Sequence, residues 1–214
     1  MGDTHIQWTN KTWNPWHGCH KISPGCKNCY MFSDKARYGQ DPNVVVRSKT
    51  TFNAPLKWTD PALVFTCSWS DWFIEEADEW RNEAREIILQ TPHLTYQILT
   101  KRPERAARWI PAVPDSNVWL GVSIEDRKYG FPRIDVLREL PAVVRFLSIE
   151  PLLEDIGELN LSGIGWVIVG GESGHGARPL SVTWVRGIVQ QCKAANVPTP
   201  GPEECAGTRW PARS

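Results

Sequence analysis

Residues 94–110 read LTYQILTKRPERAARWI, and this stretch contains one complete unit of the pattern that decides the fold. Leu94–Thr100 is a mostly apolar run of strand length, and two basic residues, Lys101 and Arg102, follow it. A helix-like stretch then covers Pro103–Ile110. Proline is favoured at the first position of a helix because its missing N–H would be unbonded there in any case. The stretch therefore predicts a strand, a polar turn and a helix in that order.

The same alternation continues outward in both directions. Further strands are expected at Ile6–Thr9, Ala62–Cys67, Val118–Ser123, Val143–Ile149 and Trp166–Val169. Further helices are expected at Asn28–Tyr38, Glu75–Gln90, Tyr129–Leu140, where Pro132 marks the start, and Val182–Ala195. Residues 10–27 are expected to form a loop and residues 40–60 an extended connector. Strands that alternate with helices indicate βαβ units and a parallel sheet. Six strands that alternate with helices fit either an open doubly wound α/β sheet or a partial (βα)6 barrel.

Length and composition limit the class of protein. The chain has 214 residues, with 24 Lys plus Arg against 24 Asp plus Glu, which excludes a globally basic nucleic-acid binder. Hydrophobic residues make up 41% and charged residues 22%, as in ordinary globular domains. No apolar run approaches the roughly 18 residues that cross a bilayer, and the first residues lack a signal-peptide pattern. We therefore expect a cytoplasmic protein with one domain over residues 1–197 and a flexible Pro-rich tail over residues 198–214, in which Cys205 is a free thiol.

Polar side chains follow nearly every expected strand. They include Ser68, Asp71, Lys101, Arg102, Ser123, Glu125, Glu150, Gly170, Gly171 and Glu172. In parallel α/β folds the carboxyl ends of the strands form the ligand site. Helix caps and turns explain single residues of this kind. They explain less well why glutamates follow three neighbouring strands and two cations follow a fourth, so a functional site is expected at this edge.

Three of the six cysteines lie together in residues 18–30, here called the cysteine loop. Cys19, Cys26 and Cys29 have the spacing C-x6-C-x2-C. Clustered cysteines in a reducing cytosol suggest metal binding or catalysis, and thiolates suit zinc or iron–sulfur clusters. A structural zinc site needs four ligands, for which His17 and His20 are candidates. Three thiolates without an obligatory fourth ligand suit a [4Fe–4S] cluster with one open iron, which is the interpretation that we favour.

Several motifs, in order along the chain, resemble the three-Cys-motif family of phage and bacterial proteins of unknown function. They are residues 12–30, 68–73, 99–105, 121–125, 147–152 and 170–174, and the resemblance covers roughly residues 6–196. This family is in turn similar to the radical S-adenosylmethionine (radical SAM) enzymes. Those enzymes place a three-cysteine loop after the first strand of a partial (βα)6 barrel, with an aromatic residue beside a cysteine, as Tyr30 is here.

The chain also departs from the radical SAM pattern at three points. The usual spacing is C-x3-C-x2-C, whereas the first gap here has six residues. The usual Gly-Gly-Glu after the second strand is replaced by the segment Ser68–Asp71, and Gly170-Gly171-Glu172 follows the sixth strand instead. An aromatic-rich strand with a Lys-containing turn, common after the last helix, is missing.

The resemblance implies an iron–sulfur enzyme that cleaves S-adenosylmethionine reductively and abstracts hydrogen from a substrate. Cys19, Cys26 and Cys29 would hold the [4Fe–4S] cluster. The resemblance assigns the other strand-end residues to the cofactor: Asp71, Glu125 or Glu172 to its ammonium, Arg102 or Lys101 to its carboxylate, Ser123 or Glu150 to its hydroxyls, with Ser68, Gly170 and Gly171 nearby. Arg178 is the candidate for a substrate anion.

The implied partners are an electron donor of flavodoxin or ferredoxin type and an unknown substrate, with a nucleotide or nucleic acid as a candidate. A phage-encoded protein would work in the host cytoplasm. The alternative is a non-catalytic phage protein in which zinc or a cluster is structural and which binds a host factor or nucleic acid. The 12 Trp residues, mostly expected in the core, would then also supply an interface.

Overall fold

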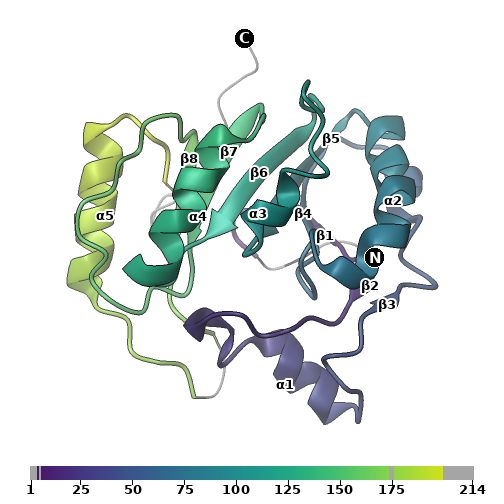
Figure 1. Cartoon of the computed structure of the whole chain (residues 1–214), viewed down its shortest axis with the longest axis horizontal. Helices are drawn as coiled ribbons and strands as arrows, with labels where there is room; N and C mark the ends of the chain where they lie inside the picture. The colour runs from purple at the N-terminus through teal and green to yellow at the C-terminus, as the bar shows by residue number, and fades with distance from the viewer. Residues whose placement is uncertain (1–3, 5, 174–175, 200–214) are drawn as a thin grey trace.

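The computed structural model of the chain describes residues 4, 6–173 and 176–199 (Figure 1). A six-stranded parallel sheet forms its centre, in the order β1-β4-β5-β6-β7-β8. These strands are β1 (Lys11–Trp13), β4 (Ala62–Thr66), β5 (Leu94–Thr100), β6 (Val118–Ser123), β7 (Val144–Ile149) and β8 (Trp166–Val169). The spatial order follows the chain without reversal, whereas a doubly wound sheet reverses at a switch point. The fold is therefore the partial-barrel type of α/β sheet that the sequence left as one of two choices.

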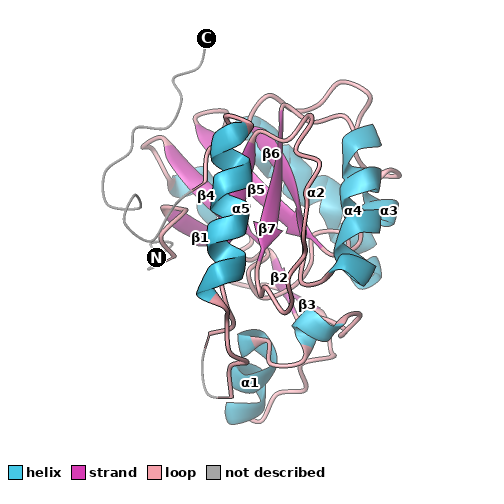
Figure 2. Ribbon diagram, turned by 90° about the vertical axis from the view of Figure 1, so that its left-hand side faces the viewer, coloured by secondary structure: helices cyan, strands magenta, loops and turns pink. Residues whose placement is uncertain are grey.

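Helices cover the outside of the curved sheet. They are α2 (Asp78–Gln90), α3 (Pro103–Ala106), α4 (Arg127–Glu139) and α5 (Val182–Ala194), and a further helix, α1 (Tyr30–Arg37), lies apart from them beyond the strand ends (Figures 1 and 2). Short 3-10 turns occur at Pro24–Cys26, Ala54–Lys57 and Glu75–Ala77. No helix in the described ranges has the length and apolar character of a membrane span.

Two expected elements are wrong at their starts. The first strand is Lys11–Trp13 rather than Ile6–Thr9, because Trp13 packs into the core while Thr9 meets β4 only through its side chain, which bonds to Leu63 and Phe65.

Pro132 does not begin a helix but lies inside α4. The Asp126 side chain accepts a hydrogen bond from the Tyr129 N–H and so starts the helix one turn earlier. A proline so close to a helix start removes only one internal hydrogen bond. Helix α3 also differs from its predicted bounds, because it ends at Ala106 rather than at Ile110.

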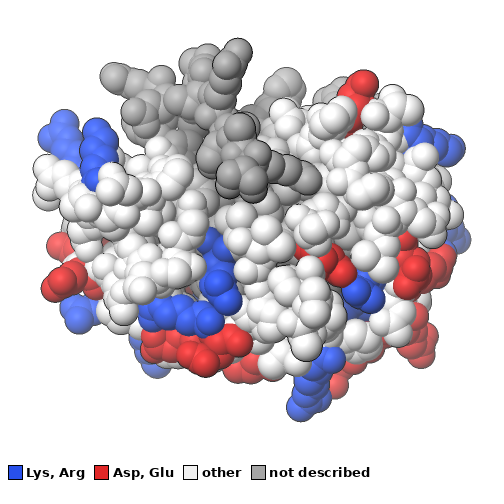
Figure 3. Space-filling model, turned by 90° about the horizontal axis from the view of Figure 1, so that it is seen from above, with Lys and Arg blue, Asp and Glu red and all other residues white. Residues whose placement is uncertain are grey.

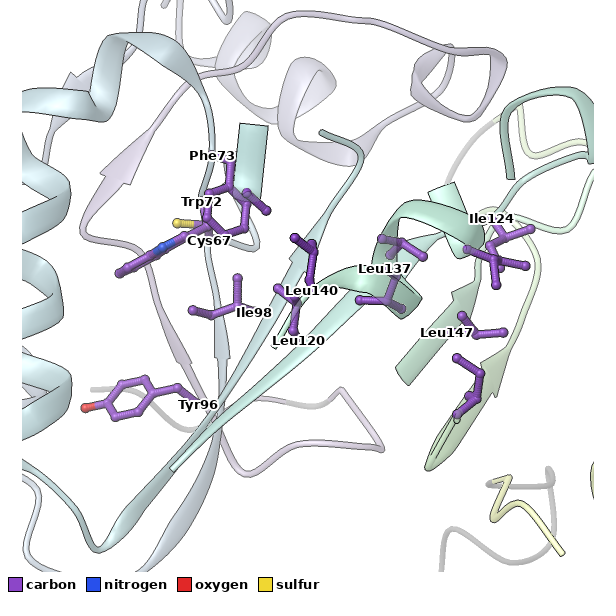
Figure 4. Packing of buried hydrophobic residues seen from close by; sticks show 14 of the residues in the cluster. Cys67, Trp72, Phe73, Tyr96, Ile98, Leu120, Ile124, Leu137, Leu140 and Leu147 are labelled. Carbon is purple, nitrogen blue, oxygen red and sulfur yellow. The ribbon is translucent and has the colours of Figure 1, made fainter. Parts of the chain in front are cut away.

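The sheet buries both of its faces. The main core lies between the sheet and the helices and includes Trp72, Phe73, Tyr96 and Leu120 (Figure 4). A second cluster of Phe146, Trp166 and Ile168, with Trp8, Leu99 and Trp119 against it, fills the inner face. Gly121 makes this possible, since a Cβ there would lie 2.5 Å from the Phe146 ring. The inner space is therefore filled by aromatic side chains on that part of the sheet.

The cysteine loop belongs to an excursion from the sheet. Two short antiparallel strands, β2 (Trp16–His17) and β3 (Val46–Arg47), pair at its base and enclose α1 and the loop. Gly18 opens the excursion at a φ of 102°, and a Cβ there would lie 2.2 Å from the Val44 carbonyl oxygen. Only glycine fits this position without a clash. The excursion places the cysteines at the carboxyl ends of the strands.

The expected tail begins next to the sheet. The Pro198 carbonyl accepts a hydrogen bond of 3.0 Å from the Val167 N–H on the edge strand β8. Residues 200–214 of the expected tail, Cys205 among them, lie outside the described residues. On the face away from α1, acidic and basic side chains lie interspersed rather than in one field of a single sign (Figure 3), in keeping with the zero net charge.

Candidate functional site

A cleft of about 350 Å³ opens at the carboxyl ends of the parallel strands. The predicted residues that line it are Cys19, Cys26, Cys29, His20, Ser68, Asp71, Lys101, Arg102, Ser123, Glu150, Gly171 and Glu172. Ile6, Trp8, Phe65 and Leu99 add apolar surface. Glu125, Gly170 and Arg178 do not line the cleft. The strand ends therefore converge as expected, while Glu125, Gly170, Arg178 and the candidate zinc ligand His17 lie outside the lining.

All three cysteines of the loop are free thiols, partly buried, and all face the same cleft. Within the described residues, no three Cys, His, Asp or Glu side chains come close enough together to bind a single metal ion. A zinc ion draws its sulfur ligands to about 2.3 Å, around one point. A [4Fe–4S] cluster binds each thiolate to a different iron, so its ligands lie farther apart. The described chain brings three cysteine sulfurs to one cleft, and soft sulfur ligands suit a metal centre of either kind.

The two histidines near the cysteine loop lie in different surroundings. His17 lies outside the cleft lining, its Nδ1 is buried without a hydrogen-bond partner, and burial together with Lys35 lowers its pKa. His20 lines the cleft, but its Nε2 bonds to the exposed carboxylate of Glu76. His20 is therefore the histidine that shares the cleft with the three cysteine sulfurs.

A buried ion pair stands beside the first cysteine. Asp71, at the end of β4, forms an ion pair of 3.2 Å with Arg102, at the end of β5. The same carboxylate accepts hydrogen bonds from Thr100 Oγ1 and the Lys101 N–H at 2.7 and 2.9 Å. Arg102 in turn donates toward the Cys19 sulfur at 3.8 Å. Burial raises the pKa of the Cys19 thiol to about 11, and Arg102 opposes that shift.

A second ion pair lies under the cysteine loop. Glu125, at the end of β6, is fully buried and bonds to Arg133 of α4 at 2.6 Å. Gly25 packs on this carboxylate so closely that a Cβ would lie 3.1–3.2 Å from its atoms. The other oxygen, Glu125 Oε1, has no hydrogen-bond partner among the described residues. Glu125 thus supports the residue before Cys26 instead of facing the cleft.

A third ion pair holds the loop from the side. Glu172, after β8, forms an ion pair with Arg178, and its Oε2 also accepts from Asn28 Nδ2 at 2.9 Å. Arg178 donates to the Pro24 carbonyl at 2.9 Å. Bonding to Arg178 holds the pKa of Glu172 at about 2. The guanidinium predicted to meet a substrate anion is therefore engaged with Glu172 and the cysteine loop.

A family model matches residues 3–199, which include every residue of the cleft and of the three ion pairs. The chain belongs to the DUF5131 family. That family is described as a protein of unknown function. No curated protein and no solved structure matches the chain.

Two charged side chains in the DUF5131 cleft, Lys101 and Glu150, take no part in the three carboxylate–arginine ion pairs. Lys101 forms no ion pair within 4 Å with any residue that the structure describes, and it lines the same cleft as Glu150, whose pKa its charge lowers against the larger effect of burial. Glu150 accepts a hydrogen bond of 3.2 Å from Ser148 Oγ and lies against Gly170, where a Cβ would be 2.4 Å from its Oε1. Burial raises the pKa of Glu150. These two residues are the charged groups of the cleft that remain available to a ligand.

Sequence reasoning missed the residues that hold the cleft together. Asn14 donates to Ser68 Oγ at 2.9 Å and accepts from the Trp69 N–H at 2.8 Å, so it ties the end of β1 to that of β4. Cys67, predicted at a strand end without a role in the site, lines the same cleft. Their sequence signal is weak because each partner lies far away along the chain.

Proposed function

We propose that this DUF5131 protein is a radical SAM-type enzyme whose Cys19, Cys26 and Cys29 hold a [4Fe–4S] cluster. The observation that supports it most is the placement of three free thiols around one cleft at the carboxyl ends of six sequentially ordered parallel strands. Cys19, Cys26 and Cys29 would hold the cluster, which would supply the electron for reductive cleavage of S-adenosylmethionine and so the means to abstract hydrogen from a substrate.

The hydrogen bonds of the cleft reduce the set of residues that would bind the cofactor. Asp71, Glu125 and Glu172 each carry an arginine partner, so Glu150 is the carboxylate left to accept the methionine ammonium. Arg102 is held by Asp71, which leaves Lys101 to bind the methionine carboxylate. Charged groups in a partly buried cleft interact more strongly than they would in water.

The inner wall would bind the rest of the cofactor and the substrate. Ser123 and Ser148 are register partners on β6 and β7, and both hydroxyls belong to buried residues that line the cleft. In this proposal their hydroxyls would donate to or accept from the ribose hydroxyls. Trp8, Phe65 and Leu99 supply apolar surface that excludes water from reactive species. A nucleotide or nucleic-acid substrate is compatible with this lining, and its identity is left to experiment.

The proposal also implies partners and a location. Reduction of the cluster needs a one-electron donor of flavodoxin or ferredoxin type. Both the donor and the reduced cluster require a reducing compartment, so the protein would work in the cytoplasm. If a phage carries the gene, that is the cytoplasm of its host. The relation of this family to phage proteins and to radical SAM enzymes is part of the same proposal.

Anaerobic purification followed by iron and sulfide analysis tests the cluster. We expect a brown protein, and dithionite plus S-adenosylmethionine should release 5′-deoxyadenosine. Cys26→Ala should lose the cluster, while Cys205→Ala, outside the matched region, should keep it as the control. Equal iron in both variants, or one zinc per chain, would refute the assignment. A cluster without cofactor cleavage would favour the alternative, a non-catalytic protein that binds a host factor or nucleic acid.

A further inference from the structure

Each cysteine of the loop has its own carboxylate–arginine pair, and the pairs come from different strand ends. Asp71–Arg102 stands beside Cys19, Glu125–Arg133 lies under Gly25 next to Cys26, and Glu172–Arg178 holds Asn28 next to Cys29. Three pairs for three cysteines is a pattern that helix capping does not explain.

The loop has little internal structure of its own to set the sulfur positions. Its regular part is the short 3-10 turn Pro24–Cys26, closed by hydrogen bonds such as Lys27 N–H to the Pro24 carbonyl at 3.2 Å. The six residues between Cys19 and Cys26 make the first gap long. A loop of this kind takes a defined shape only when groups outside it bind its backbone.

The Glu172–Arg178 pair binds the loop at two points. Arg178 donates to the Pro24 carbonyl at 2.9 Å, and Glu172 accepts from Asn28 Nδ2 at 2.9 Å. Asn28 Nδ2 also donates to the Gly176 carbonyl at 3.0 Å. The anchor points Pro24 and Asn28 lie on either side of Cys26, and Asn28 directly precedes Cys29.

Burial of these charges indicates a specific role. The side chains of Glu125 and Glu172 are 0% and 4% exposed and that of Arg133 is 6% exposed, whereas Arg178 is 29% exposed. Buried ion pairs often add little stability over apolar residues of the same size, because desolvation costs offset the attraction. Their fixed hydrogen-bond geometry, in contrast, orients the groups that they bind.

We infer that Glu172 and Arg178, supported from below by Glu125 and Arg133, are positioning residues for the Cys26 and Cys29 sulfurs. The inference rests on the proposed cluster site, in which second-layer hydrogen bonds orient the ligands. Arg102 differs from the other two arginines, because it donates directly toward a cysteine sulfur.

The first test needs no metal. In metal-free protein, the rate at which Cys26 and Cys29 react with a maleimide is followed by peptide mass spectrometry for wild type and for Glu172→Gln. We expect both thiols to react about tenfold faster in the variant, a change of about 1.4 kcal/mol in the cost of opening the loop. Cys19, held by the other pair, should keep its rate. Arg178→Lys keeps the positive charge but loses the two-pronged hydrogen bonding of the guanidinium, so its maleimide reaction rates should lie between those of wild type and Glu172→Gln.

The control is Asp135→Asn, which removes an exposed pair with Arg138 on α4. The second test reconstitutes the cluster in each variant. Glu172→Gln should bind less iron than the control and give an altered electron paramagnetic resonance spectrum of the reduced cluster, with both variants compared at a temperature at which circular dichroism shows them folded.

The outcomes separate the two proposals. Wild-type thiol rates and a wild-type spectrum in Glu172→Gln would overturn the positioning role. Failure of wild type to take up iron would overturn the proposed function, and the maleimide rates would still decide whether the pair sets the loop.

Discussion

The buried pair Asp71–Arg102 gives the sharpest test of how the site is built. The Asp71 carboxylate, 5% exposed, accepts from Phe73 N–H at 2.9 Å and Thr100 Oγ1 at 2.7 Å, and pairs with Arg102 at 3.2 Å. Asp71→Asn removes the charge and turns an amide donor toward these donors. Breaking a buried pair from one side costs about 3–5 kcal/mol, because the remaining charge stays buried without compensation.

Arg102→Met makes the complementary change. It leaves Asp71 with its neutral donors, so we expect a smaller loss of about 2–3 kcal/mol. The double variant should be about 2 kcal/mol more stable than the sum of the single effects, which measures the coupling between the two side chains.

Urea unfolding followed by tryptophan fluorescence measures these values, since the chain has 12 Trp. With a urea dependence of about 3 kcal/mol/M, Asp71→Asn should lower the unfolding midpoint by about 1 M or more. A fall of less than about 0.3 M would refute the account of Asp71 as the centre of a buried network. Strictly additive single effects would refute the pairing with Arg102.

Three further outcomes are expected. Gly121→Ala should destabilise the fold by about 1–3 kcal/mol in urea unfolding, because its Cβ would overlap the Phe146 ring. As the control, Gly187→Ala in α5 has open space around it and should stabilise the fold by about 0.5–1 kcal/mol. The pKa of Glu172 is about 2 in the folded chain and about 4.3 in the unfolded chain, so its charge adds folding stability in full above about pH 5 and loses this effect toward pH 2. The melting temperatures of wild type and Glu172→Gln should therefore converge as the pH falls toward about 2. Lys101→Met should weaken S-adenosylmethionine binding to the reconstituted protein by about tenfold or more in calorimetry, and unchanged affinity would remove Lys101 from the cofactor site.

Local patterns predicted much of the sheet. Leu94–Thr100, Val118–Ser123 and Trp166–Val169 are strands with the expected bounds, because each is an apolar run buried on both faces between polar segments. The short strand Lys11–Trp13 was missed, since its three residues carry no periodic signal and pair with β4 only through tertiary contact. Helix α4 shows the same limit, because the Asp126 cap outweighs the local effect of Pro132.

The sequence by itself determined the parallel α/β sheet, the edge at which polar strand ends gather and the cysteine trio beside them, because periodicity and spacing are local properties of the chain. Only the tertiary structure decided which of those polar groups remain free. Asp71, Glu125 and Glu172 each form an ion pair with an arginine that no local sequence rule predicts. Glu150 and Lys101 form no such ion pair with any described residue. The physical reason is that a buried charged side chain pairs with the nearest opposite charge. The folded chain, and not the distance along the sequence, sets which charge is nearest.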